Sequence, residues 1–316
     1  MIIINSIRSR LKGGLLYDSL KRSLQIRGDR KCPLEKALKK RRIVSLKNYF
    51  LTGLIMKRIN REYQQGIYSA LCSLYTDSLD CTLFNFSGIR IPKPIEKINQ
   101  ELFVDEVQDF LIYYLLEDTA FCDAVTQEGP YELQSVRISN GDAVIDCGAN
   151  IGLFSAIASK KASVVYAFEP SQNVIDKHLS KTAELNSKIY VVPKGISEKS
   201  GEATWKESTN NIHSSKISHF GMVAGEGERI STISLDEFVN DKKLESIDFI
   251  KADIEGAERY MLKGAKNVLK EFAPKLAICT YHLPDDKKIL QDLVLDANPQ
   301  YVIEHKFMKM YAYVPR

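Results

Sequence analysis

An acidic residue, two glycines and an asparagine stand close together in the stretch Asp146-Cys147-Gly148-Ala149-Asn150-Ile151-Gly152. The apolar residues before it predict a buried strand, and the residues from about 153 onward predict a helix. Glycine lets the backbone turn sharply and approach a ligand closely. The start of a helix adds backbone N–H groups that point at the ligand. This spacing predicts a site of nucleotide size at the tip of the strand.

A second acid, Glu169, ends the next predicted strand, which covers residues 164–168, and it lies 17 residues after Gly152. A carboxylate offers two acceptor oxygens and no donor, so it can accept hydrogen bonds from both hydroxyl groups of a ribose. The alternative is that Asp146 and Glu169 only cap helices or face solvent. Against it, both acids end consecutive strands, where α/β sheets bind their ligands.

The chain lacks the G-x-G-x-x-G triplet that places backbone amides on the pyrophosphate of a dinucleotide. Asp146 also stands beside the turn, where its negative charge would repel a pyrophosphate and attract a cation. S-adenosylmethionine carries a sulfonium and an amino group but no phosphate. The residues therefore favour S-adenosylmethionine over a nicotinamide or flavin cofactor.

This motif and the segments around it resemble the FkbM-type family of class I S-adenosylmethionine-dependent methyltransferases. The resemblance spans about residues 128–316, and it rests on residues 131–132, 141–152, 168–170, 251–258, 274–278 and 281–282. It implies contacts from the methionine end of the cofactor to the glycine-containing turn, from the ribose to the acid of the second strand, and from the adenine to residues 195–197. The implied cofactor-binding residues are Asp146, Gly148, Asn150, Gly152, Glu169, Pro170, Ile196 and Asp253.

Two residues are candidates for catalysis, because the resemblance implies methyl transfer to a hydroxyl group, which is a weak nucleophile until its proton is removed. His282 follows a predicted strand near Asp253, and its ordinary pKa of about 6.5 suits proton abstraction at neutral pH. We expect His282 to act as the general base and Asp253 to orient the acceptor. The alternatives are that His282 is structural and that Asp253 caps a helix or binds a metal.

No metal site is predicted. Hard divalent cations prefer oxygen ligands, and the available acids are Asp253, Asp285 and Asp286. Their spacing does not form a dense cluster. His305 lies in the last predicted hairpin, where we expect a structural role.

Five short apolar runs alternate with helical stretches from residue 134 onward, which predicts an α/β fold with a parallel, doubly wound sheet. The resemblance extends this to a Rossmann-like, seven-stranded class I methyltransferase sheet with helices on both faces. Residues 301–304 and 309–314 would form its antiparallel final hairpin. Residues 202–233 interrupt the alternation and predict a β-hairpin or a mobile insert, in which His213 and His219 would line the acceptor groove.

The net charge of +4 hides two parts of opposite charge. Residues 1–62 hold 17 Lys and Arg against 4 Asp and Glu, whereas the remainder is acidic overall. Helical spacing in this basic arm predicts a helical N-terminal region over residues 1–100, followed by a methyltransferase domain over residues 101–316. The arm either packs on the protein or meets an anionic membrane surface or an acidic glycan.

The expected function is O-methyl transfer to a sugar hydroxyl of a glycan or glycosylated metabolite, as in polysaccharide biosynthesis. One alternative is a nucleic-acid methyltransferase that uses the basic arm, although the chain lacks an acceptor motif such as Asn-Pro-Pro-Tyr. Another is an S-adenosylmethionine-binding protein without catalysis. The specific acceptor and the oligomeric state are not predicted.

The expected location is the cytoplasm, with the basic arm holding the enzyme at the inner membrane surface. The chain has six cysteines and no C-x-x-C pair, which favours a reducing compartment. Its apolar stretches are shorter than the roughly 20 residues that a transmembrane helix needs.

Overall fold

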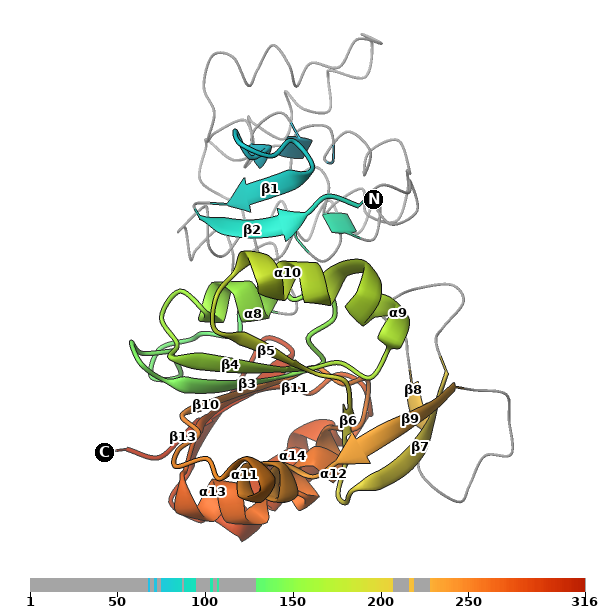
Figure 1. Cartoon of the computed structure of the whole chain (residues 1–316). Coiled ribbons are helices and arrows are strands. Elements are labelled where there is room, and N and C mark those ends of the chain that lie inside the picture. Colours follow the sequence, from blue (N-terminus) through green and yellow to red (C-terminus); the bar gives the residue numbers. More distant parts are fainter. Residues whose placement is uncertain are drawn as a thin grey trace, which may run out of the picture. The chain divides into compact units, whose positions relative to one another are not determined.

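Figure 1 shows the computed structural model of the chain. The structure describes residues 75–86, 88–94, 129–206, 216–218 and 228–315, together with single positions at 68, 71, 72, 103, 104 and 107. The predictions for the basic arm, residues 1–62, lie outside these residues, and so do His213 and His219.

A seven-stranded sheet has the strand order β12-β13-β11-β10-β3-β4-β5. Its strands are β3 (Ala143–Cys147), β4 (Val164–Phe168), β5 (Ile189–Val192), β10 (Phe249–Ala252), β11 (Lys275–Cys279), β12 (Val302–Lys306) and β13 (Lys309–Tyr313). The strands from β11 to β5 are parallel, and β13 is antiparallel to β11 and β12. The predicted α/β fold, the seven-stranded sheet and the final hairpin are thereby confirmed.

Helices cover both faces of this sheet (Figure 1). On one face lie α8 (Leu153–Ala158), α9 (Gln172–Val174), a π-helical turn (Ile175–Leu179) and α10 (Ser180–Leu185). On the other lie α11 (Leu235–Lys242), α12 (Glu258–Lys263), α13 (Lys266–Glu271) and α14 (Asp286–Ala297). Every residue of β3 and β10 is buried, as expected for central strands covered by helices on two sides.

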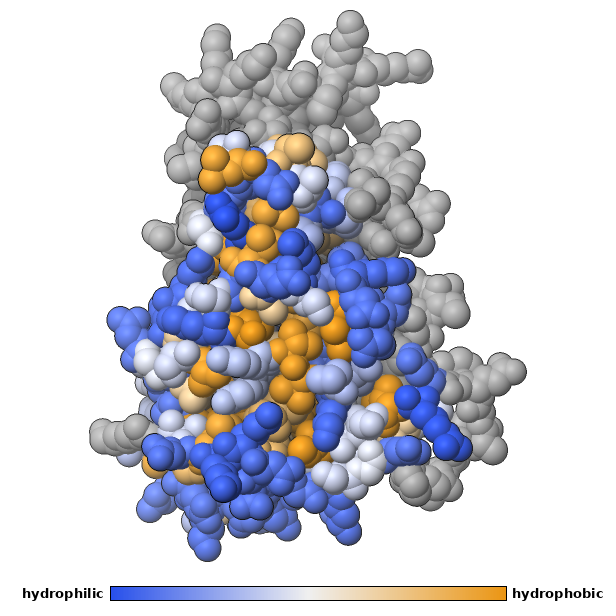
Figure 2. All heavy atoms as spheres, viewed as in Figure 1, coloured by the Kyte–Doolittle hydropathy of each residue, from blue (hydrophilic) through white to orange (hydrophobic). Residues whose placement is uncertain are grey.

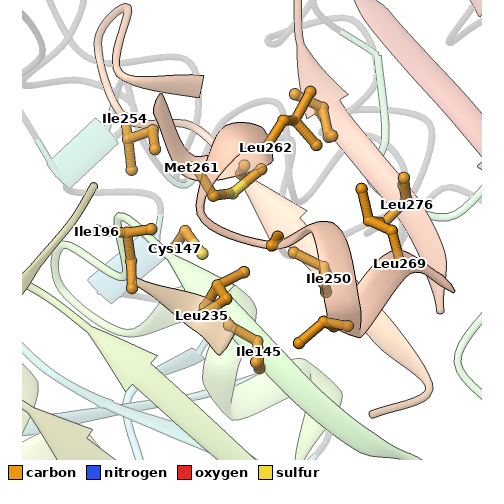
Figure 3. Close-up of a cluster of buried hydrophobic side chains, with 14 of the residues drawn as sticks. Ile145, Cys147, Ile196, Leu235, Ile250, Ile254, Met261, Leu262, Leu269 and Leu276 are labelled. Carbon is orange, nitrogen blue, oxygen red and sulfur yellow. The ribbon is translucent and has the colours of Figure 1, made fainter. Parts of the chain in front are cut away.

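The core between the sheet and helices α11–α14 consists mostly of aliphatic side chains, with a few sulfur-containing and aromatic ones, and Figure 3 shows part of it. The labelled members are Ile145, Cys147, Ile196, Leu235, Ile250, Ile254, Met261, Leu262, Leu269 and Leu276. Burying one large aliphatic side chain contributes about 1.5–3 kcal/mol. This core therefore gives a firm base to the loops that leave β3, β10 and β11.

The chain divides into two compact units, and the division differs from the predicted boundary near residue 100. One unit holds residues 1–78 and 93–126, and the other holds residues 79–92 and 127–316. Residues 79–92 join the second unit because β1 (Leu83–Phe86) and β2 (Ile89–Pro92) form an antiparallel pair that packs on α8 and α10. The side chain of Asn186 in that unit binds both the N–H and the C=O of Arg90. This part of the predicted helical region is therefore a β-hairpin.

The predicted insert is a four-stranded sheet of order β6-β9-β7-β8. Its strands are β6 (Gly195–Ile196), β7 (Gly201–Lys206), β8 (Lys216–Ser218) and β9 (Glu228–Ile233). The antiparallel pairing of β7 with β8 and β9 agrees with the predicted hairpin, and β6 adds a parallel strand at its edge.

The described part of the chain contains no helix long and apolar enough to cross a membrane. The face drawn in Figure 2 is mostly hydrophilic, with apolar side chains in narrow strips between polar ones. Attachment of the basic arm to a membrane stays a prediction.

Candidate functional site

The parallel strands bring the candidate residues to one edge of the sheet. Asp146 lies next to the last residue of β3, Glu169 directly follows β4, and Asp253 directly follows β10. His282 follows β11 three residues after its end. The loops touch at this edge, since Gly148 N–H donates to Phe168 O (3.0 Å) and Asp253 N–H donates to Cys147 O (3.1 Å). The carboxyl edge is where open α/β sheets bind ligands.

The turn after β3 requires residues that are small or that adopt the left-handed backbone conformation, for two reasons. Gly148, Asn150 and Gly152 all have positive φ angles, of 78°, 48° and 84°. A Cβ atom on Gly148 would also lie 2.0 Å from Asp253 O. Gly148 therefore allows the loops after β3 and β10 to touch. This packing is a second reason for glycine here, besides the predicted close approach of a ligand.

Asp146 has an internal partner that the sequence interpretation did not include. Its side chain is fully buried, accepts a hydrogen bond from Ser155 Oγ (2.6 Å) and lies 3.0 Å from Lys251 Nζ. Burial lowers the pKa of Lys251, but the carboxylates of Asp146 and Asp253 outweigh it, and this pKa lies above its ordinary value. The charge of Asp146 thus has a cationic partner inside the protein, and its attraction for the sulfonium stays a prediction.

Lys251 also fixes the turn, because Nζ donates to Cys147 O (3.2 Å) and Gly148 O (2.6 Å). The position of Lys251 within the predicted strand of residues 247–252 is the feature of the sequence that could have indicated a buried partner for Asp146. The direct role of Asp146 toward the cofactor stays a prediction, while its role in holding this turn follows from the contacts.

Glu169 is 7% exposed and uses each carboxylate oxygen once. Oε2 accepts from the N–H of Asn150 (3.0 Å), and Oε1 accepts from the N–H of Ser171 (3.0 Å). Burial raises the pKa of Glu169 to about 7, and the two backbone hydrogen bonds oppose that rise. Each oxygen keeps a second lone pair, so this acceptor-only group beside the glycine turn fits a ribose diol. The residues present therefore fit S-adenosylmethionine.

Ile196 belongs to the hydrophobic core and is 2% exposed. It lies in the same cluster as Cys147 and Leu235 (Figure 3). The predicted contact of this residue with the adenine, like that of Pro170 with the cofactor, stays a prediction.

Asp253 is held by two tyrosine hydroxyl groups. Tyr131 Oη donates to Oδ2 (2.7 Å), and Tyr281 Oη lies 3.3 Å from Oδ1. Burial acts to raise the pKa of Asp253, but Lys251, His282 and Lys309 together lower it, so the carboxylate is ionised at neutral pH. Asp253 does not cap α12, which begins at Glu258 without a side-chain cap. The capping alternative is therefore wrong, and Tyr131 joins the candidate site.

His282 lies among three carboxylates. Its side chain is 8% exposed, Nδ1 lies 3.0 Å from Glu258 Oε1, and Nε2 lies 3.5 Å from Asp253 Oδ1 and 3.7 Å from Glu255 Oε2. Burial acts to lower the pKa of His282. The carboxylates of Glu258, Asp253 and Glu255 together outweigh burial and raise this pKa to about 9. The predicted general base therefore carries a proton at pH 7, in contrast to the ordinary pKa assumed from sequence.

A divalent cation has one possible set of ligands in the described residues. One ligand atom each of Asp253, Glu258 and His282 lies within 4.8 Å of the other two. Asp285 and Asp286, which the sequence suggested as oxygen ligands, are instead bound by Arg259. The absence of a metal stays a prediction. If a metal were bound, its ligands would be Asp253, Glu258 and His282 rather than the three aspartates considered from the sequence.

Residues 146–311, more than half of the chain, match the family described as the methyltransferase FkbM domain. The chain belongs to the FkbM methyltransferase family. This family membership confirms the predicted class of enzyme and its cofactor, S-adenosylmethionine.

Two curated relatives are methyltransferases. The chain is 31% identical over 159 residues to hexuronic acid methyltransferase AglP of Haloferax volcanii, a match that covers 49% of this chain and 62% of the relative. It is 28% identical over 191 residues to methyltransferase sdnD of Sordaria araneosa, with 48% and 73% covered. The chain thus spans less than two thirds of the first relative's length.

Among solved structures, the chain is similar to the methyltransferase FkbM of Methylobacillus flagellatus KT. The TM-score is 0.45 at 21% sequence identity, and the likeness covers 78% of this chain and 58% of the other.

Proposed function

We propose that this protein transfers a methyl group from S-adenosylmethionine to a hydroxyl group of a sugar, within a glycan or a glycosylated metabolite. The observation that carries the proposal is the position of His282, which lies among carboxylates at the same sheet edge as Glu169 and the glycine turn. The family membership and a relative named for hexuronic acid support a sugar as the acceptor.

Glu169 would hold the ribose of the cofactor, and the turn from Gly148 to Gly152 would hold its methionine part. When bound, S-adenosylmethionine supplies an electrophilic methyl group on a sulfonium that leaves as a neutral thioether. Holding the reacting groups in line contributes about 7–11 kcal/mol to lowering the barrier. The protein's remaining task is to remove the proton of the acceptor hydroxyl.

His282 would remove that proton through Nε2, which has no hydrogen-bond partner among the described residues. Asp253, fixed by Tyr131, would accept a hydrogen bond from the acceptor and so orient it. A base with a pKa of about 9 is mostly protonated at pH 7, so we expect the rate to rise with pH up to about 9.

A hexuronic acid offers two kinds of acceptor, namely its hydroxyl groups and its carboxylate. The site presents Asp253, Glu255 and Glu258 around His282, and a further carboxylate would be repelled by them. This charge favours a hydroxyl as the methyl acceptor.

The test is methyl transfer from radiolabelled S-adenosylmethionine to two matched oligosaccharides, one with a terminal hexuronic acid and one with the corresponding neutral hexose. Product that resists mild alkali is an ether and supports the proposal. Label released by alkali is an ester and would contradict a hydroxyl acceptor. Calorimetry with S-adenosylhomocysteine checks cofactor binding separately, and no binding at millimolar concentration would overturn the cofactor site.

Nucleic-acid methylation remains the alternative, and the basic arm that would bind nucleic acid lies outside the described residues. Structured RNA as a third acceptor in the same assay tests nucleic-acid methylation. If RNA is the acceptor, its binding should fall steeply with salt, because it depends on phosphate contacts. Action in the cytoplasm at the inner membrane surface is part of the proposal, and cell fractionation with and without residues 1–62 tests it.

A further inference from the structure

The carboxylate of Glu258 has no contact with solvent. Glu258 is the first residue of α12, and its side chain is 0% exposed. Its Oε1 accepts a hydrogen bond from the N–H of Ile254 (2.9 Å) and lies 3.0 Å from His282 Nδ1. Its Oε2 has no hydrogen-bond partner among the described residues. A buried carboxylate is costly unless a cation and hydrogen bonds compensate it.

The loop before α12 is folded so that this carboxylate meets His282. Glu255 and Gly256 both have positive φ angles, of 56° and 98°. This turn brings the N–H of Ile254 onto the side chain four residues later. A Cβ on Gly256 would lie 3.7 Å from His282 Cβ, so the loop backbone lies directly against the histidine.

We infer that Glu258 is the positioning residue of a buried carboxylate–imidazole pair that holds Nδ1 of His282 and leaves Nε2 to take the acceptor's proton. This inference rests on the proposed function for its catalytic meaning, whereas the pair itself can be tested without an acceptor. The contact is an ion pair rather than a well-aligned hydrogen bond. It is the shortest contact that His282 makes with the three carboxylates facing it.

The two ring nitrogens face different surroundings. Nδ1 faces the fully buried Glu258, whereas Nε2 faces Asp253 and Glu255, whose side chains are 22% and 26% exposed. The Nε2 side is therefore the more exposed side of the ring, although Nε2 itself is buried. As the acceptor oxygen bonds to the methyl carbon, the carbon–sulfur electron pair stays on sulfur and the hydroxyl proton moves to Nε2. The imidazolium so formed keeps its counter-charge in Glu258.

The charged groups that face His282 in the described residues are Glu258 on α12 and Asp253 and Glu255 in the loop after β10. They raise the pKa of His282 despite its burial. Since Glu258 is the first of these causes, it is expected to move this pKa more than Glu255 does.

The experiment is an NMR titration of histidine-labelled full-length protein, in which His282 is assigned by its loss in His282→Gln. Glu258→Gln keeps the size of the side chain and an oxygen for the N–H of Ile254, and Glu255→Gln is the matched control. We expect His282 of the native protein to titrate near pH 9. Glu258→Gln should lower this pKa by about one to two units, and Glu255→Gln by less.

A native His282 that titrates near 6.5, or one that Glu255→Gln shifts more than Glu258→Gln, would overturn the inference. If Glu258→Gln does not fold, the native titration and the Glu258→Asp variant, which lengthens the contact, still decide it. Broadening of His282 by micromolar Mn²⁺ that Glu258→Gln abolishes would also overturn it, because the three side chains would then be metal ligands. Calorimetry with S-adenosylhomocysteine on the same samples reports on the proposed function, so the two can fail separately.

Discussion

Two buried charge clusters lie at the same edge of the sheet, and they are built differently. In the first, Asp146 has one cation, Lys251, and one hydroxyl donor, Ser155, while Lys251 also donates to two backbone carbonyls. In the second, His282 faces Asp253, Glu255 and Glu258. Lysine keeps its charge across the physiological range, whereas histidine titrates within reach of it.

The difference separates a structural pair from a pair that can exchange protons. In the first cluster, Lys251 binds Asp146 and two backbone carbonyls of the glycine turn, so one positive charge is paired with one negative charge. The second cluster has more negative than positive charge around one imidazole, and Lys251 and Lys309 help to lower the pKa of Asp253. We therefore propose that acid–base chemistry takes place at the loops after β10 and β11 and that the turn after β3 binds the cofactor.

Removing Lys251 should have the largest effect, and on stability. Lys251→Met leaves Asp146 buried with only a hydroxyl donor, which should cost about 3–5 kcal/mol in the free energy of unfolding, measured with urea. Lys275→Met removes a more exposed ion pair with Asp142, together with hydrogen bonds to Arg137 O and Ser139 Oγ, and should cost less than Lys251→Met. The double variant Asp146→Asn with Lys251→Met should recover part of the loss. A loss no greater than that of Lys275→Met would show that the first pair is not structural.

Removing His282 should act on the reaction and not on cofactor binding. His282→Gln should lower kcat by about 10²–10⁴ because it removes the general base. The affinity for S-adenosylhomocysteine, measured by calorimetry, should change less than threefold, since Glu169 and the glycine turn are intact. Unchanged turnover would contradict the division between the two clusters, and it would leave deprotonation to another group.

The sequence was most informative about the strands and their ends. Asp146, Glu169 and Asp253 are recognisable because each stands where an apolar run stops, and the parallel sheet then has to gather them. Their partners were not predictable, because they come from distant segments. Lys251 meets Asp146 through the register of β10 on β3, and Tyr131 reaches Asp253 across 122 positions of sequence.

The pKa of His282 shows the same limit. An isolated histidine is expected to titrate near 6.5, and only the fold of the loop at Glu255 and Gly256 brings three carboxylates to it. The β1–β2 hairpin was missed for a related reason. Its strands are four residues long, and Asn186 on the second unit's helical layer completes their hydrogen bonds.

The stability of the protein should fall as pH rises between 6.5 and 9. The folded state holds the proton of His282 up to a pKa of about 9, while the unfolded chain releases it near 6.5. The contribution is fully present below pH 6.5 and is lost as pH rises through 9, on the order of 3 kcal/mol in total. Urea unfolding at several pH values should show this slope, and His282→Gln should flatten it. A native slope equal to that of the variant would contradict the ion-pair assignment.

Glu169 is a third buried charge at this edge, and it sharpens the comparison because its hydrogen bonds come from backbone N–H groups. Glu169→Gln should weaken S-adenosylhomocysteine binding about 10- to 100-fold, since a hydrogen bond to a charged group contributes about 1.5–3 kcal/mol. Glu304→Gln on the exposed face of β12 is the control and should leave binding unchanged.

The same variant tests a pH dependence of the same sign as that of His282, in a lower pH window. Burial raises the pKa of Glu169 to about 7 from 4.5, so the folded state binds the proton more tightly than the unfolded chain does. Stability should therefore fall between pH 4.5 and 7 in the native protein, and Glu169→Gln should remove that fall. This window lies below the His282 window, so urea unfolding from pH 4.5 to 9 separates the two groups. If Glu169→Gln flattened only the upper window, the charge that titrates at the cofactor turn would not be Glu169.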